Sequence, residues 1–243
     1  MKDLTLDSIS SIRLYQHKRG YRFSLDAVLL AGFIRLPLSS RMVADLGAGT
    51  GVIGLLVAKR YQRVRVKLVE LQQGLYELCS RNILLNSLQN RVEAVQADIL
   101  KIPEGCYPSV QAGSFDGVIT NPPFRKPGTG KTSPYDERAL ARHEITLNLE
   151  GLLEASAYLL KNRGRFFIIY HPFRLSELVE LMRKNRLEPK RMRFVHPNLE
   201  REANMVMIEA VKDGGVEMKV EKPLFVYEKP REYTEEVKSL LGY

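Results

Sequence analysis

The sequence predicts an α/β fold, in which crossover helices join the strands of a mostly parallel sheet. Short runs rich in β-branched and aromatic residues alternate along the chain with longer runs of helical periodicity, which is the pattern such sheets produce. A Gly-rich turn, Asp45-Leu46-Gly47-Ala48-Gly49-Thr50-Gly51, follows directly after an apolar run. The 243 residues are 44% hydrophobic and 27% charged, which is enough to bury one large core.

The individual elements follow in order from this alternation. Strands are predicted at residues 42–46, 64–70, 92–96, 115–120 and 165–170, and helices at 51–60, 71–86 and 147–161, the last stopped by Gly164. A helix at 175–184 and strands at 192–195 and 204–211 come next. Asp213-Gly214-Gly215 then predicts a hairpin turn into a strand at 216–220. Residues 125–135, rich in Gly, Pro, Lys and Thr, predict a long mobile loop that could act as a lid.

Composition limits the class of protein. Lysine and arginine outnumber acidic residues 37 to 28, and the resulting charge of +9 favours a polyanionic partner. The apolar runs are too short for a membrane span, and the N-terminus shows no signal-peptide pattern, so we expect a cytoplasmic protein. Cys79 and Cys106 lack the paired spacing of a metal site or a disulfide framework, and we expect two free thiols and no metal.

The Gly-rich turn and three carboxylates predict a ligand pocket. In parallel sheets ligands bind at the carboxyl ends of the strands, where Asp45, Glu70 and Asp98 fall at or just after the first three predicted strands. S-adenosylmethionine offers ribose hydroxyls to Glu70, an adenine amine to Asp98 and positive charge near Asp45. The turn also matches a dinucleotide fingerprint over residues 49–54, so a nicotinamide-dependent oxidoreductase stays an alternative. A pyrophosphate would be repelled by so many acids.

Asn121-Pro122-Pro123-Phe124 predicts an acceptor site for an amine. The Asn121 side-chain oxygen and the Pro122 carbonyl can each accept one amine hydrogen, which would turn the nitrogen lone pair toward a methyl donor. Phe124 can stack on a flat heterocycle. With the Gly-rich turn upstream, this motif predicts methyl transfer to the exocyclic amine of a base.

Several segments give the sequence a family resemblance over most of its length: Gly20-Tyr21-Arg22-Phe23-Ser24-Leu25-Asp26, the Gly-rich turn, Asn121 to Phe124, Arg142-His143-Glu144, Val195-His196-Pro197, Glu209-Ala210 and Tyr233-Thr234. In them the sequence resembles the class I S-adenosylmethionine-dependent methyltransferases. It is most similar to the bacterial tRNA(Val) adenine-N6 methyltransferase family, which modifies the adenine at position 37 beside the anticodon.

The resemblance implies a Rossmann-like class I methyltransferase fold with a mostly parallel seven-stranded sheet and helices on both faces. It implies one domain, made of a cofactor-closing segment (residues 1–40), a catalytic core (41–211) and a C-terminal hairpin and tail (212–243). The catalytic residues would be Asn121, Pro122 and Phe124. The cofactor-binding residues would be Phe23, Asp26, Asp45, Gly47, Gly49, Thr50, Gly51, Glu70, Leu71, Asp98, Ile99 and Asn121. Phe124 stands where tyrosine is commoner in the family, so it keeps the stacking face without the hydroxyl.

Basic residues predict the RNA contacts, with a tRNA as the expected partner and a monomer or weak dimer as the expected state. The candidates are Lys18, Arg19, Arg125, Lys126, Lys131, Arg142, Arg191 and Arg193, the last two within a second basic cluster that begins at Lys184. His143 and His196 are expected to have structural or RNA-positioning roles. The alternatives left open are a protein glutamine-N5 methyltransferase, an rRNA or DNA amino-methyltransferase, and a plain RNA-binding module.

Overall fold

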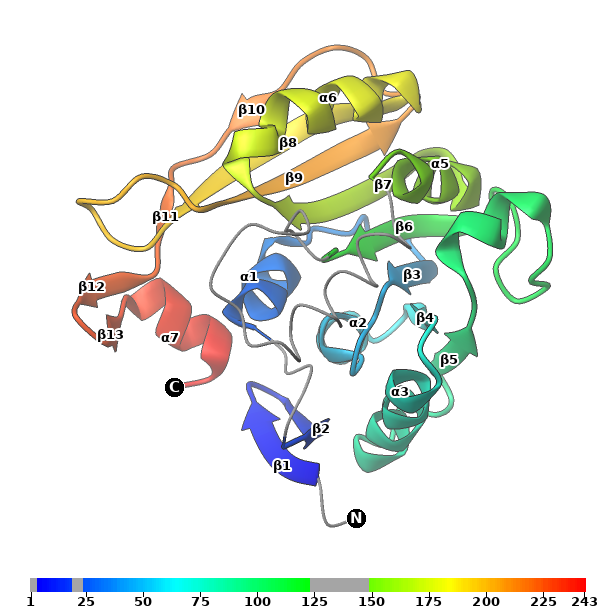
Figure 1. Ribbon diagram of the computed structural model, residues 1–243, viewed down its shortest axis with the longest axis horizontal. Coiled ribbons are helices and arrows are strands. Elements are labelled where there is room, and N and C mark those ends of the chain that lie inside the picture. The colour runs from blue at the N-terminus through cyan, green and yellow to red at the C-terminus, as the bar shows by residue number, and fades with distance from the viewer. Residues whose placement is uncertain (1–3, 19–23, 123–148) are drawn as a thin grey trace, which may run out of the picture.

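The computed structural model describes residues 4–18, 24–122 and 149–243 (Figure 1). Its central sheet has the strand order β5–β4–β3–β6–β7–β9–β8. The strands are β3 (Met42–Leu46), β4 (Arg65–Glu70), β5 (Val92–Gln96), β6 (Phe115–Thr120), β7 (Leu160–Tyr170), β8 (Leu187–His196) and β9 (Met205–Lys212). All neighbours are parallel except at β9, which runs antiparallel to β7 and to β8. The predicted mostly parallel sheet is therefore confirmed, although two short strands added beside β8 bring it to nine strands among the described residues and not seven.

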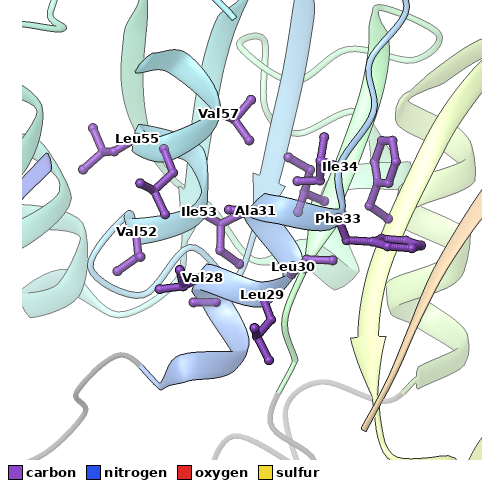
Figure 2. Close-up of a cluster of buried hydrophobic side chains, with 14 of the residues drawn as sticks. Val28, Leu29, Leu30, Ala31, Phe33, Ile34, Val52, Ile53, Leu55 and Val57 are labelled. Atoms are coloured by element: carbon purple, nitrogen blue, oxygen red, sulfur yellow. The ribbon is translucent and has the colours of Figure 1, made fainter. Parts of the chain in front are cut away.

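Helices cover both faces of this sheet (Figure 1). Helices α1 (Leu25–Phe33), α2 (Val52–Arg60) and α3 (Gln73–Leu85) contribute to one buried cluster, and α5 (Leu149–Leu159), α6 (Leu175–Lys184) and the 3-10 helix η1 (Ile99–Glu104) to the other. Alternate residues of β7 divide between the clusters, since Phe167 and Ile169 lie in the first and Phe166 and Ile168 in the second. Side chains of α1 and α2 meet in the first cluster, as Figure 2 shows.

The C-terminal hairpin predicted at Asp213-Gly214-Gly215 is wrong. Strand β10 (Lys219–Val220) pairs in parallel with β8, opposite Arg191 and Met192, and the short β11 (Leu224–Phe225) follows it on the same edge. The physical reason is that β7 and β8 already occupy both edges of β9, which leaves no free edge for the next strand. The chain must therefore cross to the outer edge of β8.

Two further strand pairs flank the core. Strands β1 (Leu4–Ile9) and β2 (Ile12–His17), which the sequence did not predict, form an antiparallel hairpin beside α3. Strands β12 (Tyr227–Lys229) and β13 (Glu232–Tyr233) form a second hairpin that leads into α7 (Glu235–Leu241), which lies beside α1 (Figure 1). The Ser10 amide donates to the Leu241 carbonyl at 2.8 Å and so ties the first hairpin to the last helix.

Boundaries differ most at β7 and β8, because the strands predicted at 165–170 and 192–195 span Leu160–Tyr170 and Leu187–His196. The predicted helix over 147–161 ends at Leu159, and β7 begins at Leu160, with a register shift opposite Phe115 and Gly117 in place of a glycine stop. Both cysteines are free thiols, as predicted. Across the described ranges, no helix is long and apolar enough to cross a membrane, and no cluster of side chains could hold a metal ion.

Candidate active site

The Gly-rich turn connects β3 to α2 at the topological switch point of the sheet, where the strand order reverses. Strand β3 pairs with β4 on one side and with β6 on the other, which is where parallel sheets of this kind bind ligands. Gly47, Gly49 and Gly51 adopt φ values of 70°, 60° and 87°. These left-handed values favour glycine. At Gly51 a Cβ atom would also lie 2.9 Å from Leu68 Cδ1, so the turn requires glycine there on two grounds.

Asp45 lies beneath this turn and not at its surface. Its side chain is 1% exposed and shares a sheet face with Val43, toward α2, where its Oδ2 accepts the Gly54 amide at 2.9 Å. Its Oδ1 is buried without a hydrogen-bond partner among the described residues. Burial raises the pKa of the carboxyl to about 7; the nearby Glu70 raises it further, while the Gly54 hydrogen bond opposes the rise.

Glu70 and Asp98 both bind backbone amides. Glu70 is 3% exposed, and its two oxygens accept the amides of Gly49 and Gln72, each at 2.9 Å. A carboxylate has about four acceptor positions, so two backbone bonds leave it able to accept others. Asp98 caps η1 by accepting the Leu100 amide at 3.0 Å. The three predicted acids thus lie at or just after the carboxyl ends of neighbouring strands; Glu70 bonds to the Gly-rich turn itself, and Asp45 to the first turn of α2.

Asn121 and Pro122 follow β6 immediately beside the Gly-rich turn. Thr120 pairs in register with Leu46, the residue before Gly47, and its hydroxyl donates to the Leu46 carbonyl at 2.9 Å. The next residue, Asn121, has a buried Oδ1 with no hydrogen-bond partner in the part of the chain that the structure describes. A buried acceptor without a donor is costly, so this oxygen beside the turn is available to a donor that the described residues do not supply.

Comparison with known proteins identifies the family. A family model, the methyltransferase small domain, matches residues 26–185, more than half of the chain. The chain belongs to this methyltransferase family. A tRNA1(Val) (adenine(37)-N6)-methyltransferase from Shewanella woodyi is 30% identical over 70% of this chain and 68% of that protein. A protein of the same name from Aliivibrio salmonicida is 27% identical over 78% of this chain and 77% of its own length.

Solved structures agree on the fold of this methyltransferase. A predicted O-methyltransferase from Agrobacterium tumefaciens superposes with a TM-score of 0.69 at 23% identity, covering 88% of this chain and 94% of that one. A tRNA m1G37 methyltransferase from M. jannaschii gives 0.57 at 15% identity, covering 88% and 58%. At these identities the likeness shows the fold alone. With the family established, the protein is an S-adenosylmethionine-dependent methyltransferase.

The residues present fit this cofactor. Buried polar atoms without a partner among the described residues occur at Asp45, Thr50 and Asn121, all at or next to the Gly-rich turn. At Gly47 a Cβ atom would meet nothing within 4 Å, so the backbone there faces open space. The Glu70 carboxylate gives the turn a negative charge that suits a cationic, hydroxyl-bearing ligand and opposes a pyrophosphate, while the raised pKa of Asp45 leaves its carboxyl partly protonated near pH 7. Leu71, 40% exposed, and Ile99, 6% exposed, follow β4 and β5.

The structure adds two asparagines that the sequence did not single out. Asn82 of α3 is fully buried; its Nδ2 donates to the Thr50 carbonyl at 2.9 Å, and its Oδ1 accepts the Tyr15 amide of β2 at 2.7 Å. Asn86, one turn later, exchanges the same kind of bonds with Arg13. The signal was weak: Asn82 is a poor helix former inside α3, but Asn86 is the C-cap of that helix, where asparagine is ordinary.

The N-terminal part of the predicted cofactor site is only partly described. Asp26 lies in the first turn of α1 and accepts the Ser24 hydroxyl at 2.9 Å; burial raises the pKa of its carboxyl, and Ser24 and His171 oppose the rise. Several predicted site residues lie outside the described ranges: Arg19, Phe23, Phe124, Arg125, Lys126, Lys131, Arg142 and His143. His196 was expected to have a structural or RNA-positioning role, and its Nδ1 forms a hydrogen bond of 2.9 Å with the Arg201 carbonyl oxygen.

The predicted RNA contacts of Arg191 and Arg193 stay untested, but both guanidinium groups have acidic partners within the protein. Arg191 is 7% exposed, pairs with Glu209 and Glu221, donates to the Phe33 carbonyl at 2.7 Å and lies over the Phe33 ring. Arg193 makes a two-bond pair with Glu236. Both hold the C-terminal segment and α1 against β8. The pattern of basic residues on alternate strand positions could not reveal these acidic partners.

Lys184 and Arg186 of the second basic cluster lie near the amino end of β8, at the opposite end of the strands from Asn121. Lys184 ends α6, just before β8 begins, and pairs with Glu150, while Arg186 pairs with Asp213. Strand β8 runs from there to His196, which is roughly 30 Å at the usual rise per residue. Only its carboxyl end lies at the same end of the strands as Asn121. Of the predicted RNA contacts within the described ranges, Lys18, exposed at the end of β2, is the one that still fits.

Proposed function

We propose that this methyltransferase transfers a methyl group to the N6 amine of an unpaired adenine in tRNA, at the position beside the anticodon. The observation that carries the proposal is the buried Oδ1 of Asn121, which has no hydrogen-bond partner among the described residues and lies just after β6, next to the cofactor turn. An exocyclic amine is a donor with two hydrogens, and it matches an acceptor held in this way.

Bound S-adenosylmethionine would supply an electrophilic methyl group on its sulfonium. The chain's own task is then to orient the acceptor nitrogen and to exclude water. Asn121 Oδ1 would accept one amine hydrogen and the Pro122 carbonyl the other, which directs the lone pair at the methyl. Phe124, which follows two residues later in the sequence, would stack on the adenine ring. No strong base is needed, because the proton can leave after transfer.

Two further observations support an RNA substrate. The relatives that match most of the chain carry the name tRNA1(Val) (adenine(37)-N6)-methyltransferase, and the chain has a charge of +9. An anticodon-loop base is already partly unstacked, so presenting it to the site costs less than flipping a base out of a duplex. We place the enzyme in the cytoplasm, where its tRNA is, and expect it to act as a monomer or weak dimer.

The experiment is a methyl-transfer assay with radiolabelled S-adenosylmethionine and a choice of acceptors. Folded tRNA(Val) transcript should be labelled, and nucleoside mass spectrometry should identify N6-methyladenosine. The matched control carries guanine at the target position, and it should accept no methyl, because its carbonyl would face Asn121 and Pro122 with an acceptor. Label in protein extract, in duplex DNA or in ribosomal RNA instead of tRNA would favour the corresponding alternative substrate and contradict the proposal.

A further inference from the structure

His171 and the exposed Phe173 follow β7 at the carboxyl ends of the strands, where Asn121 also lies. In the parallel pairing of β6 with β7, Thr120 lies opposite Ile168, so that Asn121 and Pro122 are level with the last residues of β7. The chain continues as His171-Pro172-Phe173, and Pro172 begins the 3-10 helix η2 (Pro172–Arg174). Neighbouring strands lie about 4.8 Å apart, so this segment starts one strand spacing from the proposed amine site.

The pair is rigid and presents one open aromatic ring. Phe173 is 71% exposed, and its ring stacks on that of His171 with centroids 5.3 Å apart and an interplanar angle of 29°. His171 Nδ1 in turn forms a hydrogen bond of 2.8 Å with the Asn204 carbonyl oxygen. The proline and the fixed imidazole hold Phe173 in place before any ligand arrives, which lowers the ordering cost of stacking. Scattered exposed apolar side chains are ordinary, but a supported ring beside an active site is not.

One exposed arginine lies on the adjoining loop, between Glu200 and Glu202. The loop between β8 and β9 emerges at the same end of the strands, since Tyr170 and Phe194 both lie opposite Val206. It carries Arg201, which is exposed and has no acidic partner among the described residues. The Asn204 carbonyl that holds His171 belongs to the same loop. The exposed face of Phe173 suits an unpaired nucleotide base, which can stack on it.

We propose that Phe173, supported by His171, stacks on an unpaired base that flanks the target adenine in the RNA substrate. This inference rests on the proposed function. Turning the target adenine out of its loop uncovers one face of its neighbour, and Phe173 takes the place of the displaced stacking partner. Because every base has such a face, the contact adds affinity with little sequence preference.

The chain contains no tryptophan, so replacements with this residue report on their own surroundings. Phe173→Trp keeps a flat ring in place, and saturating tRNA should quench its fluorescence as a base stacks on it. The matched control is Leu38→Trp: Leu38 is 95% exposed and precedes β3 at the opposite edge of the sheet, and tRNA should leave its emission unchanged.

Kinetics provide the second readout. Phe173→Ala should raise the KM for tRNA about tenfold or more and leave cofactor affinity unchanged, whereas Phe173→Trp should retain the wild-type KM. An unquenched Phe173→Trp enzyme that still methylates tRNA, or a wild-type KM for Phe173→Ala, would overturn the stacking surface alone. Wild-type enzyme that transfers no methyl to any tRNA would overturn the proposed function and this surface with it.

Discussion

The carboxamide of Asn82 holds the Thr50 carbonyl of the Gly-rich turn at 2.9 Å. The same side chain binds both backbone groups of Tyr15, so one buried residue fastens β2 and the cofactor turn to α3. Asn86 fastens β2 in the same way at Arg13 but makes no bond to the turn. The two asparagines therefore separate the docking of the N-terminal hairpin from the shaping of the cofactor site.

Asn82→Ala and Asn86→Ala should have similar effects on stability and different effects on binding. Each leaves partly buried backbone groups of β2 unpaired and should lower the free energy of unfolding by about 1–3 kcal/mol. Asn82→Ala alone should also weaken S-adenosylmethionine binding, because it frees the Thr50 carbonyl. Denaturant titration and calorimetry measure the two effects, and equal cofactor affinities in the two folded variants would refute a role for Asn82 in the site.

Glu70→Ala should weaken cofactor binding by about 1.5–3 kcal/mol, because the charge-assisted hydrogen bonds of its carboxylate are removed. The structure adds a second cause, since the Gly49 amide is left without its acceptor and the turn without its support. Glu70→Gln keeps an acceptor for that amide, so its affinity for the cofactor should lie between those of the wild type and Glu70→Ala. Calorimetry showing wild-type affinity for both variants would remove Glu70 from the site.

Asp45 should make stability depend on pH with an unusual sign. Burial raises the pKa of its carboxyl to about 7 in the folded protein, against about 3.9 in the unfolded chain. Between these values the folded state binds the extra proton, so this group's contribution to stability is full below about pH 4 and is lost as pH rises through about 7. Asp45→Asn cannot titrate, and its stability relative to wild type should rise from pH 5 to pH 8; a constant difference would contradict the raised pKa.

The salt dependence of tRNA binding should separate the basic residues that touch RNA from those that do not. Arg193→Ala removes a guanidinium already paired with Glu236, and the slope of log affinity against log salt should stay at its wild-type value. Neutralising Lys126 and Lys131 together should reduce that slope by roughly 0.7–0.9 for every phosphate that either lysine neutralises. A flatter slope for Arg193→Ala would identify it as an RNA-binding residue, and an unchanged slope for the lysine pair would mean that both are merely solvated.

Much of the fold could be predicted because its signals are local. The Gly-rich turn, the apolar strands and the motif at Asn121 each depend on a few consecutive residues, and they lie together because parallel strands place their carboxyl ends at one edge. The differences arise where distant residues decide. The strand after Asp213 had no free edge on β9 to pair with, and Arg191 found Glu209 and Glu221 as partners. Pattern along the chain does not reveal which distant residues will meet.

The site shows the same division. The positive φ values of Gly47, Gly49 and Gly51 follow from their residue type. The roles of Asn82 and of the ring pair His171 and Phe173 depend on which elements pack beside them. Asp45, expected at the rim of the pocket, lies beneath the turn, because Gly54 leaves room for its side chain on the α2 face.

The most direct test of the central claim compares turnover and cofactor affinity in Asn121→Ala. Asn121 Oδ1 is proposed to orient the acceptor amine, so removing it should lower kcat for tRNA methylation about 100-fold or more. Binding of S-adenosylmethionine, measured by calorimetry on the same preparation, should stay close to wild type. An Asn121→Ala enzyme that forms N6-methyladenosine in tRNA at the wild-type rate would contradict the account.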